Sequence, residues 1–116
     1  MRSLALLALT LAPFLAACPS GEASDPRAAL VKRGKVVYDT NCIACHSPDP
    51  RKEGPVGPAN SCASSELLAA RVLRNAYPPG YKPKRDTQAM VPRPYLEKEL
   101  PALAAYLQSL GCEQAQ

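Results

Sequence analysis

The feature that most constrains how this chain can fold is the pentapeptide Cys42-Ile43-Ala44-Cys45-His46. Its two thiols stand three residues apart, and an imidazole follows the second thiol directly. At the end of a helix, cysteines at this spacing can each bond to the same edge of one rigid group, while the next residue projects its side chain toward the centre of that group. The pattern therefore predicts a fold built around a group that the chain holds covalently.

A cysteine pair followed directly by histidine is the attachment pattern of haem c. Each thiol adds to one of the two vinyl groups on one porphyrin edge, and Nε2 of His46 becomes the proximal ligand of the iron. Two other interpretations stay open. A thioredoxin-like redox pair should accompany a βαβ pattern that this chain lacks, and half of a zinc site could be completed by Cys62 and Cys112. The histidine and the expected helical layout favour one covalent haem c.

The N-terminus predicts export. One positive charge at Arg2 precedes an apolar run over residues 4–17, which is too short for a permanent membrane span and indicates a secretory signal. The run ends in Leu15-Ala16-Ala17-Cys18, which resembles the lipobox of bacterial lipoproteins. We therefore expect a signal peptide over residues 1–17 and a lipid on Cys18, which would tether the protein to the periplasmic face of a bacterial membrane. The alternative is an ordinary signal peptide and a soluble periplasmic protein with Cys18 as a stray thiol.

The length leaves room for one small domain. We expect it over residues 26–112, after a tether at 18–25 and before a short tail at 113–116. The chain has no tryptophan and few other aromatic residues, so a large apolar cofactor would supply much of its core. The formal net charge of +4 at pH 7 lacks the dense basic footprint that nucleic acid binding needs.

Capping residues and apolar periodicity predict three helices and no strand. The first helix is expected over residues 26–39, after a capping side chain in Ser24-Asp25. The second is expected over residues 65–76, and the third over residues 97–110, where Gly111 supplies the stop. The proline-rich segments 47–58 and 77–94 are expected to be loops, and the second is expected to be ordered on the core. The expected fold class is all-α.

From about residue 26 to 110, the chain resembles the class I cytochrome c family. The matching features are Gly34 and Tyr38 in a helix ahead of the pentapeptide, a Gly-Pro loop after it, a late methionine, and a final helix that ends in residues 104–110. The resemblance implies a small cytochrome c fold, in which three main helices and long loops rich in proline and glycine surround one haem.

The same resemblance implies roles for single residues. In the family, a glycine of the first helix meets an aromatic residue of the last helix, which transfers to Gly34 and Tyr106. A carbonyl of the Gly-Pro loop accepts the Nδ1 proton of the proximal histidine, which maps onto Pro55 or Pro58. Many members have a tryptophan near the haem propionates, and here one of three tyrosines would take its place: Tyr77, Tyr81 or Tyr95.

The distal iron ligand can be argued by elimination. The chain contains one histidine, and its two methionines are Met1, which leaves with the signal, and Met90. A soft, neutral sixth ligand must then be Met90, whose setting before Val91 and Pro92 also resembles the axial-methionine loop of the family. The alternative is a methionine that only fills the core.

The remaining cysteines, Cys62 and Cys112, are expected to form a disulfide, because an exported protein lies in an oxidising compartment. Such a bond would join the end of the last helix to the segment before the second helix. Two free thiols or an intermolecular bridge are the alternatives.

The expected function is single-electron transfer, without enzymatic activity or a small-molecule substrate. The expected partners are redox proteins, either a separate donor and acceptor or a dehydrogenase or oxidase complex. Iron ligated by both His46 and Met90 leaves no open position for a substrate. Two rivals are a haem enzyme or gas sensor in which Met90 is displaced, and a haem-free metal or disulfide lipoprotein. Four positively charged residues flank Met90 and are expected to form a cationic collar: Lys82, Lys84, Arg85 and Arg93. The collar would steer docking to an acidic partner. The alternative is that these charges merely solvate the loop.

Overall fold

The computed structural model describes residues 24–112, which form an all-helical fold without any strand in that range. The helices are α1 (Pro26–Asn41), α2 (Ser65–Arg74), the short 3-10 helix η1 (Pro94–Glu99) and α3 (Leu100–Gln108). The expected all-α fold class is confirmed. The expected signal peptide, the lipidated Cys18, most of the tether and the tail at 113–116 lie outside the described residues.

The first two helices begin where the capping residues predict. The Asp25 side chain accepts a hydrogen bond from the Arg27 amide at 3.0 Å, and Pro26 occupies the first turn of α1, where a missing N–H costs nothing. The Ser64 hydroxyl accepts from the Leu67 amide at 3.1 Å at the start of α2. The α1 helix continues two residues beyond the predicted end, to Asn41, and so leads directly into the pentapeptide.

The ends of the other helices differ from the prediction. The α2 helix ends at Arg74 instead of residue 76, because Asn75 adopts the left-handed conformation with φ 52°. The last α-helix begins at Leu100 instead of residue 97, and η1 precedes it. A helix that began at residue 97 would need an amide donor at Pro101, which has none, whereas Pro101 fits in the first turn of α3.

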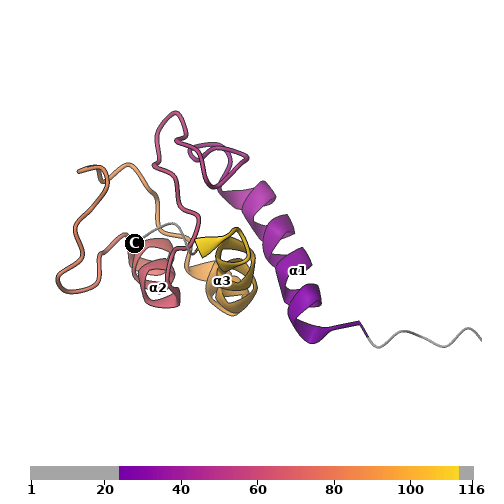
Figure 1. Cartoon of the computed structure of the whole chain (residues 1–116). Helices are drawn as coiled ribbons and strands as arrows, with labels where there is room; N and C mark the ends of the chain where they lie inside the picture. Colours follow the sequence, from indigo (N-terminus) through magenta and orange to yellow (C-terminus); the bar gives the residue numbers. More distant parts are fainter. Residues whose placement is uncertain (1–23, 113–116) are drawn as a thin grey trace, which may run out of the picture.

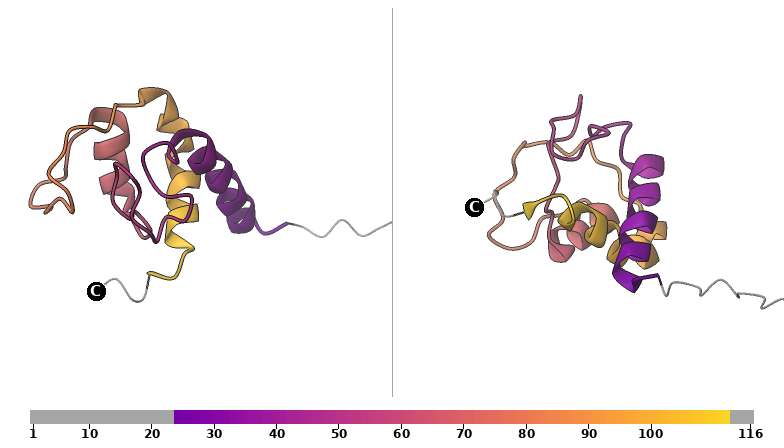
Figure 2. Two further views of the ribbon diagram at one scale, coloured as in Figure 1. Left: turned by 90° about the horizontal axis from the view of Figure 1, so that it is seen from above. Right: turned by 45° about the vertical axis from the view of Figure 1, so that its right-hand side comes forward.

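The first and last helices cross at a glycine. A Cβ atom added to Gly34 would lie 1.9 Å from the Ala102 carbonyl oxygen and 2.7 Å from Cβ of Tyr106. Only a residue without a side chain therefore allows α1 and α3 to approach this closely, and the crossing of Gly34 with Tyr106 that the family resemblance implied is present. In Figure 1 and in the left view of Figure 2, α3 lies between α1 and α2.

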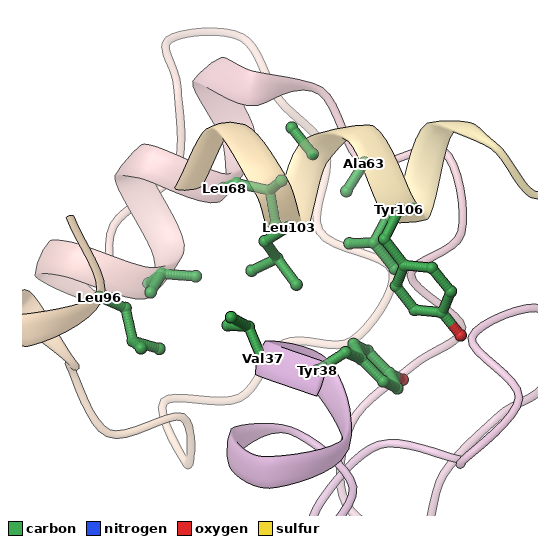
Figure 3. Close-up of a cluster of buried hydrophobic side chains, with 10 residues drawn as sticks. Val37, Tyr38, Ala63, Leu68, Leu96, Leu103 and Tyr106 are labelled. Carbon is green, nitrogen blue, oxygen red and sulfur yellow. The ribbon is translucent and has the colours of Figure 1, made fainter. Parts of the chain in front are cut away.

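The buried side chains fill the space around α3. Val37 and Tyr38 of α1 point toward Leu103 and Tyr106 of α3 in Figure 3. The rings of Tyr38 and Tyr106 lie 5.7 Å apart between centroids, at a tilt favourable for aromatic pairs. The core is small, and several of its members, including Leu68, also line the cavity described below. Within residues 24–112, no helix has the length and apolar character that a membrane span requires.

Candidate functional site

The residues that sequence reasoning singled out for the cofactor meet at one cavity of about 410 Å³. This volume falls in the range of about 300 to 1,000 Å³ that is typical of cofactor sites. Cys42, Cys45, His46 and Met90 all line it. Four parts of the chain line the cavity: the C-terminal end of α1, the loop after the pentapeptide, the helix α2, and the long segment between α2 and η1. This last segment lies beside α2 on the left of Figure 1.

The pentapeptide continues the turn of α1. The Cys42 amide bonds to the Tyr38 carbonyl at 2.9 Å, and the His46 amide bonds to the Cys42 carbonyl, also at 2.9 Å. Cys42 and Cys45 are free thiols, each half-buried. Burial raises the pKa of the Cys42 thiol to about 11, helped by Cys45 and opposed by the positive charge of Arg93. A reactive thioredoxin-like pair needs a lowered thiol pKa, so this environment argues against that interpretation.

The imidazole of His46 has a fixed orientation. Its Nδ1 lies 2.9 Å from the carbonyl oxygen of Pro58, which can only accept, so Nδ1 carries the proton and donates it. In the neutral ring, Nε2 then has its lone pair free for a metal. Of the two Gly-Pro carbonyls that the family resemblance allowed, this partner is Pro58 and not Pro55.

The loop that follows the pentapeptide lies directly against this ring. A Cβ atom added to Gly57 would lie 2.4 Å from Cε1 of His46 and 2.6 Å from its Nδ1. The Val56 and Gly57 amides both donate to the Cys45 carbonyl, at 3.1 and 2.8 Å. The fully buried Tyr38 donates its hydroxyl to the Ser47 carbonyl at 2.7 Å. These bonds fix the loop on the imidazole.

Met90 reaches the same cavity from the segment between α2 and η1. Its side chain is half-buried and packs on the core cluster. Two bonds attach the segment to α2 and its C-cap: the Asn75 amide group donates to the Gln88 carbonyl at 3.2 Å, and the Arg93 amide donates to the Val72 carbonyl at 2.6 Å. The structure therefore brings together His46 and Met90, which are far apart in the sequence.

Cys62 and Cys112 are joined as a disulfide with their Cα atoms 5.3 Å apart. Their sulfurs are therefore not free to complete a zinc site with Cys42 and Cys45. Among residues 24–112, no group of three or more histidine, cysteine, aspartate or glutamate side chains is arranged to hold a metal ion. This arrangement disfavours the zinc interpretation.

Arg71 lines the cavity and was missed by sequence reasoning. Its Nη1 is buried and has no hydrogen-bond partner within the described residues, while its Cζ lies 4.2 Å from the ring centroid of Tyr77. The periodicity of α2 contained a signal, because Arg71 stands three residues after the buried Leu68 and so falls on a neighbouring face. An unpaired guanidinium nitrogen in a cofactor cavity is suited to a carboxylate.

The three candidate tyrosines separate into two groups. Tyr77 and Tyr81 line the cavity, with their rings stacked at 5.4 Å between centroids. Tyr95 is 69% exposed and donates its hydroxyl to the Asn41 side chain at 3.1 Å. Tyr95 is not among the residues that line the cavity.

Two residues of the expected cationic collar, Lys84 and Arg85, bond to a neighbouring loop. Lys84 donates to the Ala59 carbonyl at 2.9 Å, and Arg85 donates to the Val56 carbonyl at 2.8 Å and pairs with Glu53. Arg93 donates to the carbonyl of Val91 at 3.0 Å. Lys82 is exposed. The side chains of Lys84 and Arg85 therefore bridge two loops.

A family model described as Cytochrome c matches residues 31–111. Among curated proteins, no match to the chain is found. The matched range contains all residues that line the cavity. These residues fit a covalent haem c. Gly57 leaves room for an imidazole with a free Nε2, two free thiols line the same cavity, and the unpaired Nη1 of Arg71 can donate to a propionate.

Proposed function

Because the chain belongs to the cytochrome c family and carries one haem c, we propose that it is a single-electron carrier whose iron is ligated by His46 and Met90. The observation that carries this proposal is that both side chains line one cavity. The imidazole also has the tautomer that ligation requires, since Pro58 accepts its Nδ1 proton.

When bound, the haem supplies an iron that gains or loses one electron. The chain's own residues determine how that electron is used. Cys42 and Cys45 would hold the porphyrin by thioether bonds, and His46 and Met90 would be the two ligands that the chain provides to the iron. With no open position, oxygen or a substrate has no access to the iron, which favours a carrier over an enzyme. One imidazole and one thioether also raise the reduction potential relative to two imidazoles.

We further propose that Arg71 binds a haem propionate. The guanidinium of Arg71 lies over the face of the Tyr77 ring. This contact supports the role, because a cation held over an aromatic face keeps a fixed orientation. Tyr77 and Tyr81 would then take the place of the tryptophan that many family members have near the propionates. Binding of the carboxylate would satisfy a donor that otherwise stays buried and unpaired.

The setting of the carrier is also a proposal. A signal peptide over residues 1–17 and a lipid on Cys18 would hold the protein at the periplasmic face of a bacterial membrane, with residues 18–25 as a tether. Its partners would be redox proteins of a respiratory or dehydrogenase chain. The Cys62–Cys112 disulfide would form in the oxidising compartment after export.

Carbon monoxide binding tests the proposal. The full chain is produced together with a cytochrome c maturation system, and denaturing electrophoresis with a haem peroxidase stain shows whether the haem stays with the chain. The reduced wild type is then expected to leave carbon monoxide unbound, whereas Met90→Ala, with an open position, binds it and serves as the positive control. Binding by the wild type would favour the rival haem enzyme or gas sensor. A colourless product would favour the haem-free lipoprotein.

A further inference from the structure

Two loops border the cavity and are joined by side chains. The first, residues 53–59, contains Gly57 and Pro58, which contact the imidazole of His46. The second, residues 84–90, ends at Met90. The two loops meet through Lys84 and Arg85, whose side chains cross from the second loop to the first. We call this set of contacts the Arg85 clasp, and its members are Glu53, Gly54, Val56, Ala59, Lys84 and Arg85.

The guanidinium of Arg85 makes most of these contacts. Its Nη1 donates to the Val56 carbonyl at 2.8 Å, and its Nη2 donates to the Gly54 carbonyl at 3.3 Å and to the Glu53 carboxylate. Lys84 adds one bond, from Nζ to the Ala59 carbonyl at 2.9 Å. The Arg85 side chain is 33% exposed and that of Glu53 is 61% exposed, so water screens the ion pair. The two carbonyl bonds therefore matter more than the charge of Glu53.

The groups that accept from Arg85 belong to the residues that orient His46. The Val56 amide donates to the Cys45 carbonyl at 3.1 Å while the Val56 carbonyl accepts from Arg85. A Cβ atom added to Gly54 would lie 2.6 Å from Cα of His46, so Gly54 packs on the backbone of the pentapeptide. Glu53 in turn accepts from the Ala59 amide at 3.1 Å, which closes the loop on itself. Arg85 thus docks on a part of the chain whose position is already fixed.

We infer that Arg85 is a positioning residue for Met90. It ties the methionine segment to the loop on His46, so that the sulfur stays at the iron against competing ligands. The inference rests on the proposed function, since it takes Met90 as the distal ligand. A variant without the clasp still contains Met90. Its segment 84–90, however, would move away from the cavity more often.

An imidazole titration of the oxidised holoprotein tests this inference. Imidazole binds the iron only where it displaces the methionine, so its apparent affinity reports how firmly Met90 is held. In Arg85→Gln we expect about fivefold tighter imidazole binding than in the wild type, the equivalent of about one lost hydrogen bond of ordinary net strength. Lys82→Gln is the matched control, because it removes one positive charge from an exposed neighbouring side chain. Its affinity should change less than about twofold.

Two further variants separate positioning from charge and from general stability. Arg85→Lys keeps the charge but cannot reach the two carbonyls with one planar fork, so it should restore only part of the wild-type affinity. Glu53→Gln should have a small effect alone and no added effect in the Arg85→Gln background, because both residues act through one clasp. Equal imidazole affinities in Arg85→Gln and Lys82→Gln, with or without a change in melting temperature, would overturn the inference.

The reference measurements distinguish this inference from the proposed function. If the oxidised wild type lacks the spectroscopic signature of a methionine ligand, the proposed function fails. The clasp is then judged by hydrogen exchange at the Val56 and Gly57 amides, which should quicken in Arg85→Gln and not in Lys82→Gln. If Arg85→Gln does not fold, Arg85→Lys takes its place in both measurements, with a smaller change expected in each. Exchange rates that match the wild type would overturn the clasp.

Discussion

Gly57 is important at its position because it has no Cβ atom. The loop backbone can lie on the His46 ring only where no Cβ intervenes, since such an atom would be 2.4 Å from Cε1. Gly57→Ala must therefore displace the ring or the loop. We expect a loss of about 1 to 3 kcal/mol in the free energy of unfolding, as in other overpacked sites, and an altered haem spectrum.

Gly80→Ala is the control for this variant. Gly80 has a positive φ of 78°, but an added Cβ would meet nothing within 4 Å. It should cost about 1 kcal/mol through backbone strain alone and leave the spectrum unchanged. If Gly57→Ala also leaves the spectrum unchanged, the loop does not fix the imidazole.

Arg71 allows a second prediction at the scale of one residue. A positive charge beside a propionate stabilises the reduced haem, so Arg71→Gln should lower the midpoint potential by tens of millivolts. For one electron, about 59 mV corresponds to a tenfold change in the equilibrium constant. A spectroelectrochemical titration measures the shift.

The matched control is Arg74→Gln, one turn further along α2, where the side chain is exposed. It should change the potential much less, because water screens its charge. Equal shifts in the two variants would contradict a role for Arg71 in the cavity.

At the scale of helices, the crossing of α1 and α3 depends on Gly34. A Cβ atom there would clash with the backbone carbonyl of Ala102, which cannot turn away as a flexible side chain could. Gly34→Ala should therefore separate the helices and lower the free energy of unfolding by about 2 kcal/mol or more, measured by urea denaturation. Val36→Ala on the exposed face of the same helix should cost less than about 0.5 kcal/mol. Similar losses in both would show that the crossing tolerates a side chain.

The helices were predictable because their signals are local. The caps at Asp25 and Ser64 could be read from the sequence, and the structure contains both. The start of α3 was predicted too early, although the missing amide of Pro101 held the information needed to correct it. The spacing of one pentapeptide and the scarcity of histidine and methionine pointed to four residues that the structure places around one cavity: Cys42, Cys45, His46 and Met90.

Other parts of the site could not be predicted from local patterns. Arg85 stands 31 residues from Gly54, and no local sequence pattern near either residue predicts their contact. The choice of Pro58 over Pro55 likewise depends on how the loop folds back on Cys45. Such contacts follow from the path of long loops, which carry neither a helical nor a strand periodicity.

At the scale of the whole molecule, the Cys62–Cys112 disulfide closes a long loop, with a sequence separation of 50. In the chain-entropy model, a loop of this length contributes about 4 kcal/mol, chiefly by restricting the unfolded chain. The variant with both cysteines changed to serine should therefore unfold at a markedly lower urea concentration. Mass spectrometry of the unreduced protein after alkylation checks the bond itself. Alkylation of both thiols without prior reduction would refute it.

The molecule as a whole is a small helical core with two long loops that enclose a cavity, and its function as a carrier depends on which ligand fills the distal side. The near-infrared absorption of the oxidised holoprotein, compared between the wild type and Met90→Ala, measures this most directly. We predict a weak methionine-to-iron band in the wild type and its loss in Met90→Ala. A wild type without the band, or a band that survives in Met90→Ala, would contradict the account.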